Sequence, residues 1–247
     1  MKDEEKTMEQ LINELVELRQ WIAELKAETQ RKQLEEELRK RTEQTIRYQT
    51  TLLELAKMDN SNLDSTLKRI TEVDSRTLDV ERVSVWLFNE GRSEIICENL
   101  YKLNGNFHEN GSMLQAKDYP TYFQALEESR TLAANDACTD PRTSEYAEGY
   151  LKPYGITSMM DIPIRVHGKV VGIVCHEHTG PMRKWTVEEQ DFVASIADMV
   201  SLALEASEHR QAEEALQKAH DELETKVRER TSELAKANQA FAHFRWN

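Results

Sequence analysis

Apolar residues recur at alternating spacings of three and four along the first part of the chain. Residues 7–58 carry this pattern in two stretches that are out of phase, because Leu25 and Leu34 lie nine residues apart. The pattern predicts a helix of roughly 75–80 Å with a heptad seam, and we expect a local break or skew near residues 28–33. The helix is too polar to be buried within one chain, so the pattern also predicts a partner helix.

The period changes from helical to alternating in the middle of the chain, where it predicts strands and short helices. A tight turn at His167-Gly168 joins the last two strands, and a turn at residues 89–92 makes the first two strands a hairpin. The expected elements are helices at 63–78, 119–129 and 140–151, strands at 83–88, 93–103, 131–134, 158–166 and 169–177, and a loop at 104–117.

A second long helix is predicted from Thr186, which forms a capping box with Glu189. Its heptad frame still runs at the last residue, Asn247, so we expect an output domain to follow. Polar residues at the core positions His209, Glu213, His220 and Arg230 would weaken the coiled coil, as a switch requires, although ordinary coiled coils also carry such residues. The expected dimer and transmission seam consists of Leu52, Leu55, Phe192, Met199, Leu202, Leu216, Leu223, Val227 and Leu234.

These elements predict an α+β fold, an antiparallel sheet with flanking helices in an α/β sandwich. The helix before the first strand and the helix after the last strand should lie side by side on one sheet face. A parallel homodimer would combine them into a four-helix bundle with coiled coils leaving it at both ends.

The bulk composition excludes several classes of partner. The net charge of −13 argues against nucleic acid and against an anionic membrane surface. No apolar run approaches the length of a membrane span, and Met1–Glu5 is too acidic for a signal peptide. Cys97, Cys138 and Cys175 form no C-x-x-C pair, which favours a reducing cytoplasm.

Two segments carry a family resemblance. Tyr154–Ile164 followed by Gly168–Cys175 resembles the late-strand signature of GAF domains, and Trp185–Phe192 with Ser195–Ala197 resembles their closing helix. The resemblance covers about residues 50–206. The flanks 34–44 and 223–240 are similar to connectors of bacterial multidomain sensor histidine kinases.

The resemblance implies an N-terminal signalling helix at 1–58, a GAF sensory domain at 59–205 and a C-terminal signalling helix at 206–247. It implies a cytoplasmic module, without a kinase domain of its own, that relays a ligand or an upstream state through a parallel homodimer to a histidine kinase of a two-component system. The alternatives are a dimerisation spacer without a ligand and a bilin or haem sensor. GAF domains bind cyclic nucleotides, bilins, haem, small metabolites or nothing, so no cofactor is assigned.

The resemblance places a ligand pocket between the sheet and the segments that cover its other face. Strict alternation would put Ile95, Cys97, Asn99, Tyr101 and Leu103 on one face of their strand. The aromatic residues could equally form a second small core. The candidate pocket residues are Trp86, Phe88, Cys97, Asn99, Tyr101, Tyr122, Phe123, Tyr146, Tyr150 and Met160.

Specific ligands find little support in the sequence. The signature of cyclic-nucleotide GAF domains is not present, and Tyr150–Pro153 lacks the thiol that attaches bilins. The segment Asp136–Thr139 is only weakly similar to a second bilin-cysteine motif, and Cys138 is as well explained as a surface-loop thiol. The cysteines show no cluster for methionine sulfoxide reduction.

Two histidines on one strand, His176 and His178, are weak candidates for a metal site, because a third ligand is required. His108 and His167 could supply it, but a polar strand end explains the run equally well. His243 lacks the surroundings of a phosphoacceptor. We find no nucleophile triad, paired carboxylates or phosphate-binding glycine loop, so no catalytic residue is predicted.

Overall fold

The computed structural model describes the backbone of residues 8–244. It describes the side chains of residue 8 and of residues 10–236. Its N-terminal element, α1 (Met8–Ala56), is a continuous helix, so of the break or skew expected near residues 28–33 the break does not occur. These residues form helices well, and Glu28–Lys32 is an ion pair of 2.8 Å across one turn. A phase change in the apolar pattern moves the seam around the helix, but it leaves the backbone hydrogen bonds intact.

The chain divides after Thr51 into two units, of which the second contains the sheet. Helix α2 (Leu63–Leu78) begins where the Asn62 side chain accepts a hydrogen bond from the Ser65 N–H, and it ends at Asp79 in the left-handed conformation. Helix α4 (Val187–Phe244) begins with the predicted capping box. Thr186 N donates to Glu189 Oε2 (2.8 Å), and Glu189 N donates to Thr186 Oγ1 (3.2 Å).

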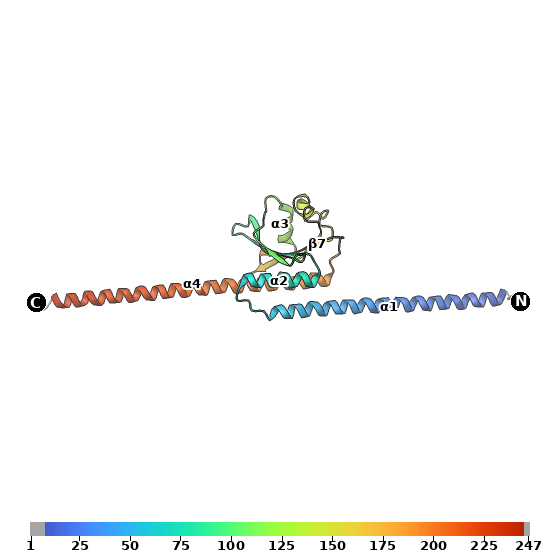
Figure 1. The fold of residues 1–247 in the computed structure, drawn as a ribbon, viewed down its shortest axis with the longest axis horizontal. Coiled ribbons are helices and arrows are strands. Elements are labelled where there is room, and N and C mark those ends of the chain that lie inside the picture. The colour runs from blue at the N-terminus through green and yellow to red at the C-terminus, as the bar shows by residue number, and fades with distance from the viewer. Residues whose placement is uncertain (1–7, 245–247) are drawn as a thin grey trace. The chain divides into compact units, whose positions relative to one another are not determined.

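The sheet is antiparallel throughout its described pairs, with the order β3-β2-β1-β7-β6-β5 and β4 also paired with β2. Helices α2 and α4 pack together on one sheet face, the helix face (Figure 1). The strands are β1 (Arg82–Phe88), β2 (Glu94–Lys102), β3 (Phe107–Glu109), β4 (Met113–Gln115), β5 (Leu132–Ala134), β6 (Ile156–Val166) and β7 (Lys169–Thr179). The α+β fold expected from the sequence is confirmed.

The opposite sheet face, the cover face, is closed by shorter segments. These are α3 (Pro120–Glu128), the 3₁₀ turn η1 (Ser144–Tyr146) and the π-helical turn η2 (Ala147–Leu151). The short helix expected at 140–151 therefore begins only at Ser144 and consists of 3₁₀ and π-helical turns. In η2 the Lys152 N–H donates to the Ala147 carbonyl, five residues back, and this wider turn replaces the α-helical spacing.

The stretch 104–117 contains two short strands instead of the expected loop. β3 pairs with one end of β2 and β4 with the other, and Gly111 turns the chain between them with a φ of +81°. Strands of three residues are too short to show an alternating pattern. Their pairing depends on the edge that β2 offers, which is a tertiary feature.

A β-bulge in the β1–β2 pair decides which side chains reach each face. Val85 is paired with Asn99 but Trp86 with Cys97, so Glu98 is left without a partner and is exposed. Cys97 therefore lies on the cover face. Asn99 lies on the helix face, and so does Tyr101, two residues further along the strand. The expectation that all odd-numbered residues of β2 share one face is wrong at this bulge.

The seam residues divide into buried and exposed groups. Phe192 is buried in the domain, as is Leu55 near the end of α1, while Leu52 and Met199 are half-buried. His243, which the sequence does not support as a phosphoacceptor, lies outside the described side chains. The exposed seam residues of α4 are Leu202, Leu216, Leu223, Val227 and Leu234.

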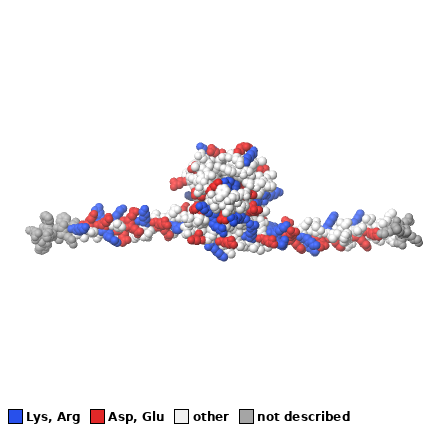
Figure 2. All heavy atoms as spheres, viewed as in Figure 1, with Lys and Arg blue, Asp and Glu red and all other residues white. Residues whose placement is uncertain are grey.

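Charged side chains surround these seams. Lysine and arginine alternate with aspartate and glutamate along both long helices (Figure 2), and several pairs lie one helical turn apart, such as Lys40–Glu36 at 2.9 Å. Such exposed pairs add little stability each. Within residues 8–244 no helix combines the length and apolar character that a membrane crossing needs.

Candidate ligand pocket

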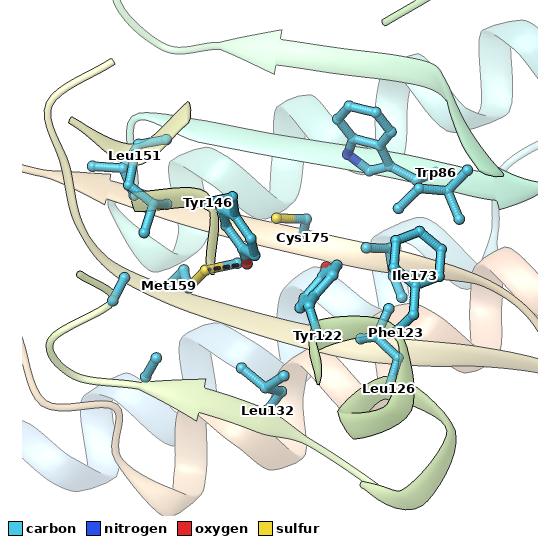
Figure 3. Packing of buried hydrophobic residues seen from close by; sticks show 14 of the residues in the cluster. Trp86, Tyr122, Phe123, Leu126, Leu132, Tyr146, Leu151, Met159, Ile173 and Cys175 are labelled. Carbon is cyan, nitrogen blue, oxygen red and sulfur yellow. Dashed lines mark hydrogen bonds between the residues drawn. The ribbon is translucent and has the colours of Figure 1, made fainter. Parts of the chain in front are cut away.

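A cluster of aromatic side chains fills the space between the cover and the sheet (Figure 3). Tyr122 from α3 and Tyr146 from η1 lie beside Cys175 of β7, and their rings meet edge to face with centroids 5.0 Å apart. The Tyr146 hydroxyl points toward Met159 and donates to its Sδ at 3.0 Å. The cavity among these side chains is about 10 Å³, which is room for a single water molecule. It is lined by Trp86, Leu114, Tyr122, Tyr146, Tyr150, Met159, Ile173, Cys175 and Glu177.

Four of the predicted pocket residues line this cavity directly: Trp86, Tyr122, Tyr146 and Tyr150. Three others, Phe88, Phe123 and Cys97, belong to the same cluster but do not line the cavity. The ring centroids of Phe88 and Phe123 are 5.8 Å apart, and Cys97 is buried beside Trp86.

Asn99, Tyr101 and Met160 lie on the helix face and do not reach the cavity. Asn99 accepts a hydrogen bond from Thr71 of α2 (2.6 Å), and the Tyr101 hydroxyl accepts one from Arg76 of α2 (3.2 Å). Met160 is replaced in the pocket by Met159, since successive strand residues point to opposite faces. The β-bulge turns Asn99 and Tyr101 away from the pocket. Met160 was predicted one residue out of phase with the strand.

A buried carboxylate, Asp161, lies behind the cavity lining, where it contacts Tyr122 and is paired with Cys175 across the sheet, and it was not among the predicted residues. The Tyr122 hydroxyl donates to its Oδ2 at 2.6 Å, whereas Oδ1 has no hydrogen-bond partner among the described residues. Burial raises the pKa of Asp161 to about 6, although the neighbouring Cys175 thiol and the Tyr122 hydroxyl oppose this change. The side chain is therefore mostly ionised at neutral pH, inside an aromatic environment.

An ion pair closes the other end of the cavity. Arg82 Nε donates to Glu177 Oε2 at 2.5 Å, and both side chains are buried. Arg82 Nη2 also donates to the Tyr150 hydroxyl (3.2 Å), and the guanidinium lies 4.8 Å from the centre of the Tyr154 ring. Sequence reasoning missed this pair because its members are 95 residues apart, and only the β1–β7 pairing of Arg82 with Glu177 joins them.

The comparisons with known proteins agree with this architecture. A family model described as the GAF domain matches residues 62–204, more than half of the chain. The chain belongs to the GAF domain family. No curated protein matches it significantly.

Solved structures show the same fold at low sequence identity. The GAF domain of a phosphoenolpyruvate-protein phosphotransferase from Coxiella burnetii has a TM-score of 0.54 and 15% identity, with 68% of this chain and 96% of that chain covered. A phycoerythrobilin-bound GAF domain from a cyanobacterial phytochrome has a TM-score of 0.58 and 18% identity, with coverage of 67% and 98%. The free methionine-R-sulfoxide reductase of Neisseria meningitidis, in complex with its substrate, has a TM-score of 0.52 and 13% identity, with coverage of 67% and 89%.

The thiols of this GAF domain are poorly placed for nucleophilic chemistry. Burial raises the pKa of Cys97 to about 12 and raises the pKa of Cys175 as well. Both thiols therefore stay protonated at neutral pH, and the thiolate is the reactive form. Cys138 is half-buried and lies near the Ile156 carbonyl.

The two candidate metal-binding histidines have other partners. His176 is fully buried on the helix face, where Nε2 lies 2.7 Å from Asp74 Oδ2 and Nδ1 lies 3.1 Å from the Met160 carbonyl oxygen. Because both ring nitrogens of His176 are engaged, neither is available to a metal. His178 lies beside Glu81, at 2.9 Å. The described residues contain no group of three side chains that could hold a metal ion.

Asp161→Asn should reduce the pH dependence of the GAF domain's stability. Because the pKa of Asp161 is raised from 3.8 to about 6, the unfolded chain releases this proton at lower pH than the folded domain does. The contribution of Asp161 to the free energy of unfolding is fully present below pH 4. It falls by about 2–3 kcal/mol as the pH rises through 6. Urea unfolding at pH 4, 5.5 and 7.5 should show this loss in the wild type relative to the variant. Parallel profiles would contradict the raised pKa.

Proposed function

We propose that this chain is the sensory and signal-transmitting module of a cytoplasmic bacterial sensor histidine kinase. Its GAF domain binds a small ligand, or receives a change from an upstream domain, and passes the change on through its helices. The chain itself has no catalytic activity. The protonated, buried thiols described above support this distinction from the methionine sulfoxide reductase of the same fold.

The observation that carries this proposal is the continuity of α4. Its first part is buried on the sheet through Phe192, Val193 and Ile196, and it contacts β6 and α2. The same helix continues to Phe244 without interruption. Because an α-helix is stiff over this length, a rotation or shift at the sheet is transmitted along it.

A parallel homodimer supplies the partner that the exposed seams need. Leu216, Leu223, Val227 and Leu234 are all exposed in the single chain. Leu216 and Leu223 occupy d positions of the heptad frame, and Val227 and Leu234 occupy a positions. Exposed leucines at this spacing along a charged helix are typical of a coiled-coil seam. Two identical α4 helices in register would bury these residues against each other.

Cysteine cross-linking tests the parallel arrangement. In a Cys138→Ser background, Leu216→Cys and Leu223→Cys should each form disulfide-linked dimers under mild oxidation, since equivalent seam residues face each other across the axis. Lys218→Cys, on the outer face of the same helix, is the matched control and should cross-link about tenfold less, because its partner lies too far away. Equal cross-linking at all three positions, or none at any, would contradict the proposal.

The second candidate function is a structural dimerisation spacer without a ligand. The small size of the cavity favours it, because Tyr122, Tyr146 and Trp86 already fill most of the space. A bilin or haem would have to displace these rings. A small ligand needs far less movement, and this is the reason we prefer a small-molecule sensor to a pigment-binding one.

A further inference from the structure

The charges around the pocket do not balance. Glu177 is matched by Arg82, with which it forms a buried ion pair. Asp161 has no such partner on the pocket side, since its two hydrogen-bonding neighbours there, the Tyr122 hydroxyl and the Cys175 thiol, are neutral. Its Oδ1 has no hydrogen-bond partner among the described residues. A buried carboxylate with an unused oxygen is costly unless a donor or a cation reaches it.

The walls of the pocket suit a cation better than any other ligand. The rings of Trp86, Tyr122, Tyr146 and Tyr150 line the cavity, and the face of each ring carries partial negative charge. Burial raises the pKa of Tyr122 and Tyr146 well above the ordinary value, so these phenols stay neutral. Aromatic rings beside a carboxylate form the arrangement that holds quaternary and primary ammonium groups.

Other ligand classes fit less well. An anion would meet the Asp161 and Glu177 carboxylates, while the Arg82 guanidinium is already paired with Glu177. A neutral apolar ligand would leave Asp161 Oδ1 unpaired and would lose the attraction of the negative site.

We propose that this pocket binds a small free organic ammonium ion, which rests against Trp86, Tyr122 and Tyr146 and pairs with Asp161. The proposal rests on the sensory function proposed above and names the class of ligand. The cover must move to admit the ligand, because the cavity is about 10 Å³. Tyr146 and Tyr150 are carried by the 3₁₀ and π-helical turns η1 and η2, which have weaker hydrogen-bond geometry than an α-helix.

Calorimetric titration of the full chain with choline tests the ligand class, and 3,3-dimethylbutan-1-ol serves as the neutral probe of the same shape. Choline should bind at least ten times more tightly than the alcohol. Asp161→Asn should weaken choline at least tenfold and leave the alcohol unchanged, since asparagine can still accept the Tyr122 hydrogen bond. Tyr146→Phe should retain choline binding because it keeps the ring, whereas Tyr146→Leu should lose most of it.

Three results would overturn the ammonium proposal: equal binding of both probes, choline binding unchanged in Asp161→Asn, or no choline binding by the folded protein. Circular dichroism of each variant establishes that it is folded. Native mass spectrometry of the protein as purified reports on the proposed function separately. A bound non-cationic compound would be consistent with the proposed sensory function and would contradict only the proposal that the ligand is an ammonium ion. Absence of any bound mass together with no choline binding would favour the spacer.

Discussion

Replacing Asp74 with alanine should lower the free energy of unfolding by about 3–5 kcal/mol, because it leaves the buried His176 without its charged partner. Both side chains are fully buried, and Nε2 of His176 lies 2.7 Å from Asp74 Oδ2. Burial alone would lower the pKa of His176, but Asp74 and the Met160 carbonyl raise it above its ordinary value. The imidazolium form can donate from both nitrogens, one to each partner. Urea unfolding of the two proteins measures the loss.

The matched control for this variant is Asp64→Ala on the same helix. Asp64 forms an exposed ion pair of 2.7 Å with Lys68, so its loss should cost at most about 1 kcal/mol. The stabilisation from His176 is present below the ordinary pKa of histidine, and it is lost as the pH rises through the raised pKa of the folded state. Equal costs for Asp74→Ala and Asp64→Ala would show that the buried pair is not stabilising.

This pair matters for function because it fixes α2 to the sheet directly behind the pocket. On β7, Cys175 and Glu177 line the cavity, while His176 between them points to the helix face and meets Asp74. A displacement of β7 by a ligand would therefore reach α2 through this contact, and α2 packs against α4. The buried pair gives the proposed signal a physical route from the pocket to the transmission helix.

Replacing Gly172 with alanine should cost about 3 kcal/mol, at the upper end of the usual range for overpacking, because the new methyl group meets the backbone of the neighbouring strand. A Cβ atom on Gly172 would lie 2.1 Å from the Trp86 carbonyl oxygen and 2.7 Å from Leu87 Cδ2. Strand β1 would have to separate from β7 beside Trp86, which lines the pocket. Overpacking of this kind typically destabilises by about 1–3 kcal/mol. Thermal and urea unfolding would measure the change.

Gly168→Ala separates this steric effect from a simple loss of glycine. Gly168 lies in the turn between β6 and β7 with a φ of +78° and has no neighbouring atom within 4 Å of an added Cβ. Its replacement should cost about 1 kcal/mol through backbone strain alone. If Gly172→Ala were no more destabilising than Gly168→Ala, the close approach of β1 and β7 would be wrong.

The helices were largely predictable because their signals are local. Asn62 as a cap and the apolar spacing that follows it define α2, and Thr186 with Glu189 defines the beginning of α4. The long strands β6 and β7 were found for the same reason, since alternation and the His167-Gly168 turn lie within a few residues of each other. The GAF family itself could be inferred from these late strands and the closing helix.

Local signals failed where the backbone geometry depends on neighbours. The continuous α1 shows that a shift in an apolar seam does not require a break in the helix. The short helix expected at 140–151 consists of 3₁₀ and π-helical turns, and the short strands β3 and β4 formed because β2 offered an edge to pair with.

The pocket divides in the same way between sequence and tertiary structure. Its aromatic character was predictable, since Trp86, Tyr122, Tyr146 and Tyr150 stand out along the chain. Its polar groups were not, because Asp161 lies on a strand that reads as apolar, and Arg82 meets Glu177 only through the pairing of two strands. The sequence determines which residues favour helix, strand or burial over short distances. Only the tertiary structure decides which sheet face a side chain reaches and which charges meet, because one bulge reverses the alternation and strand pairing joins residues that are distant in the chain.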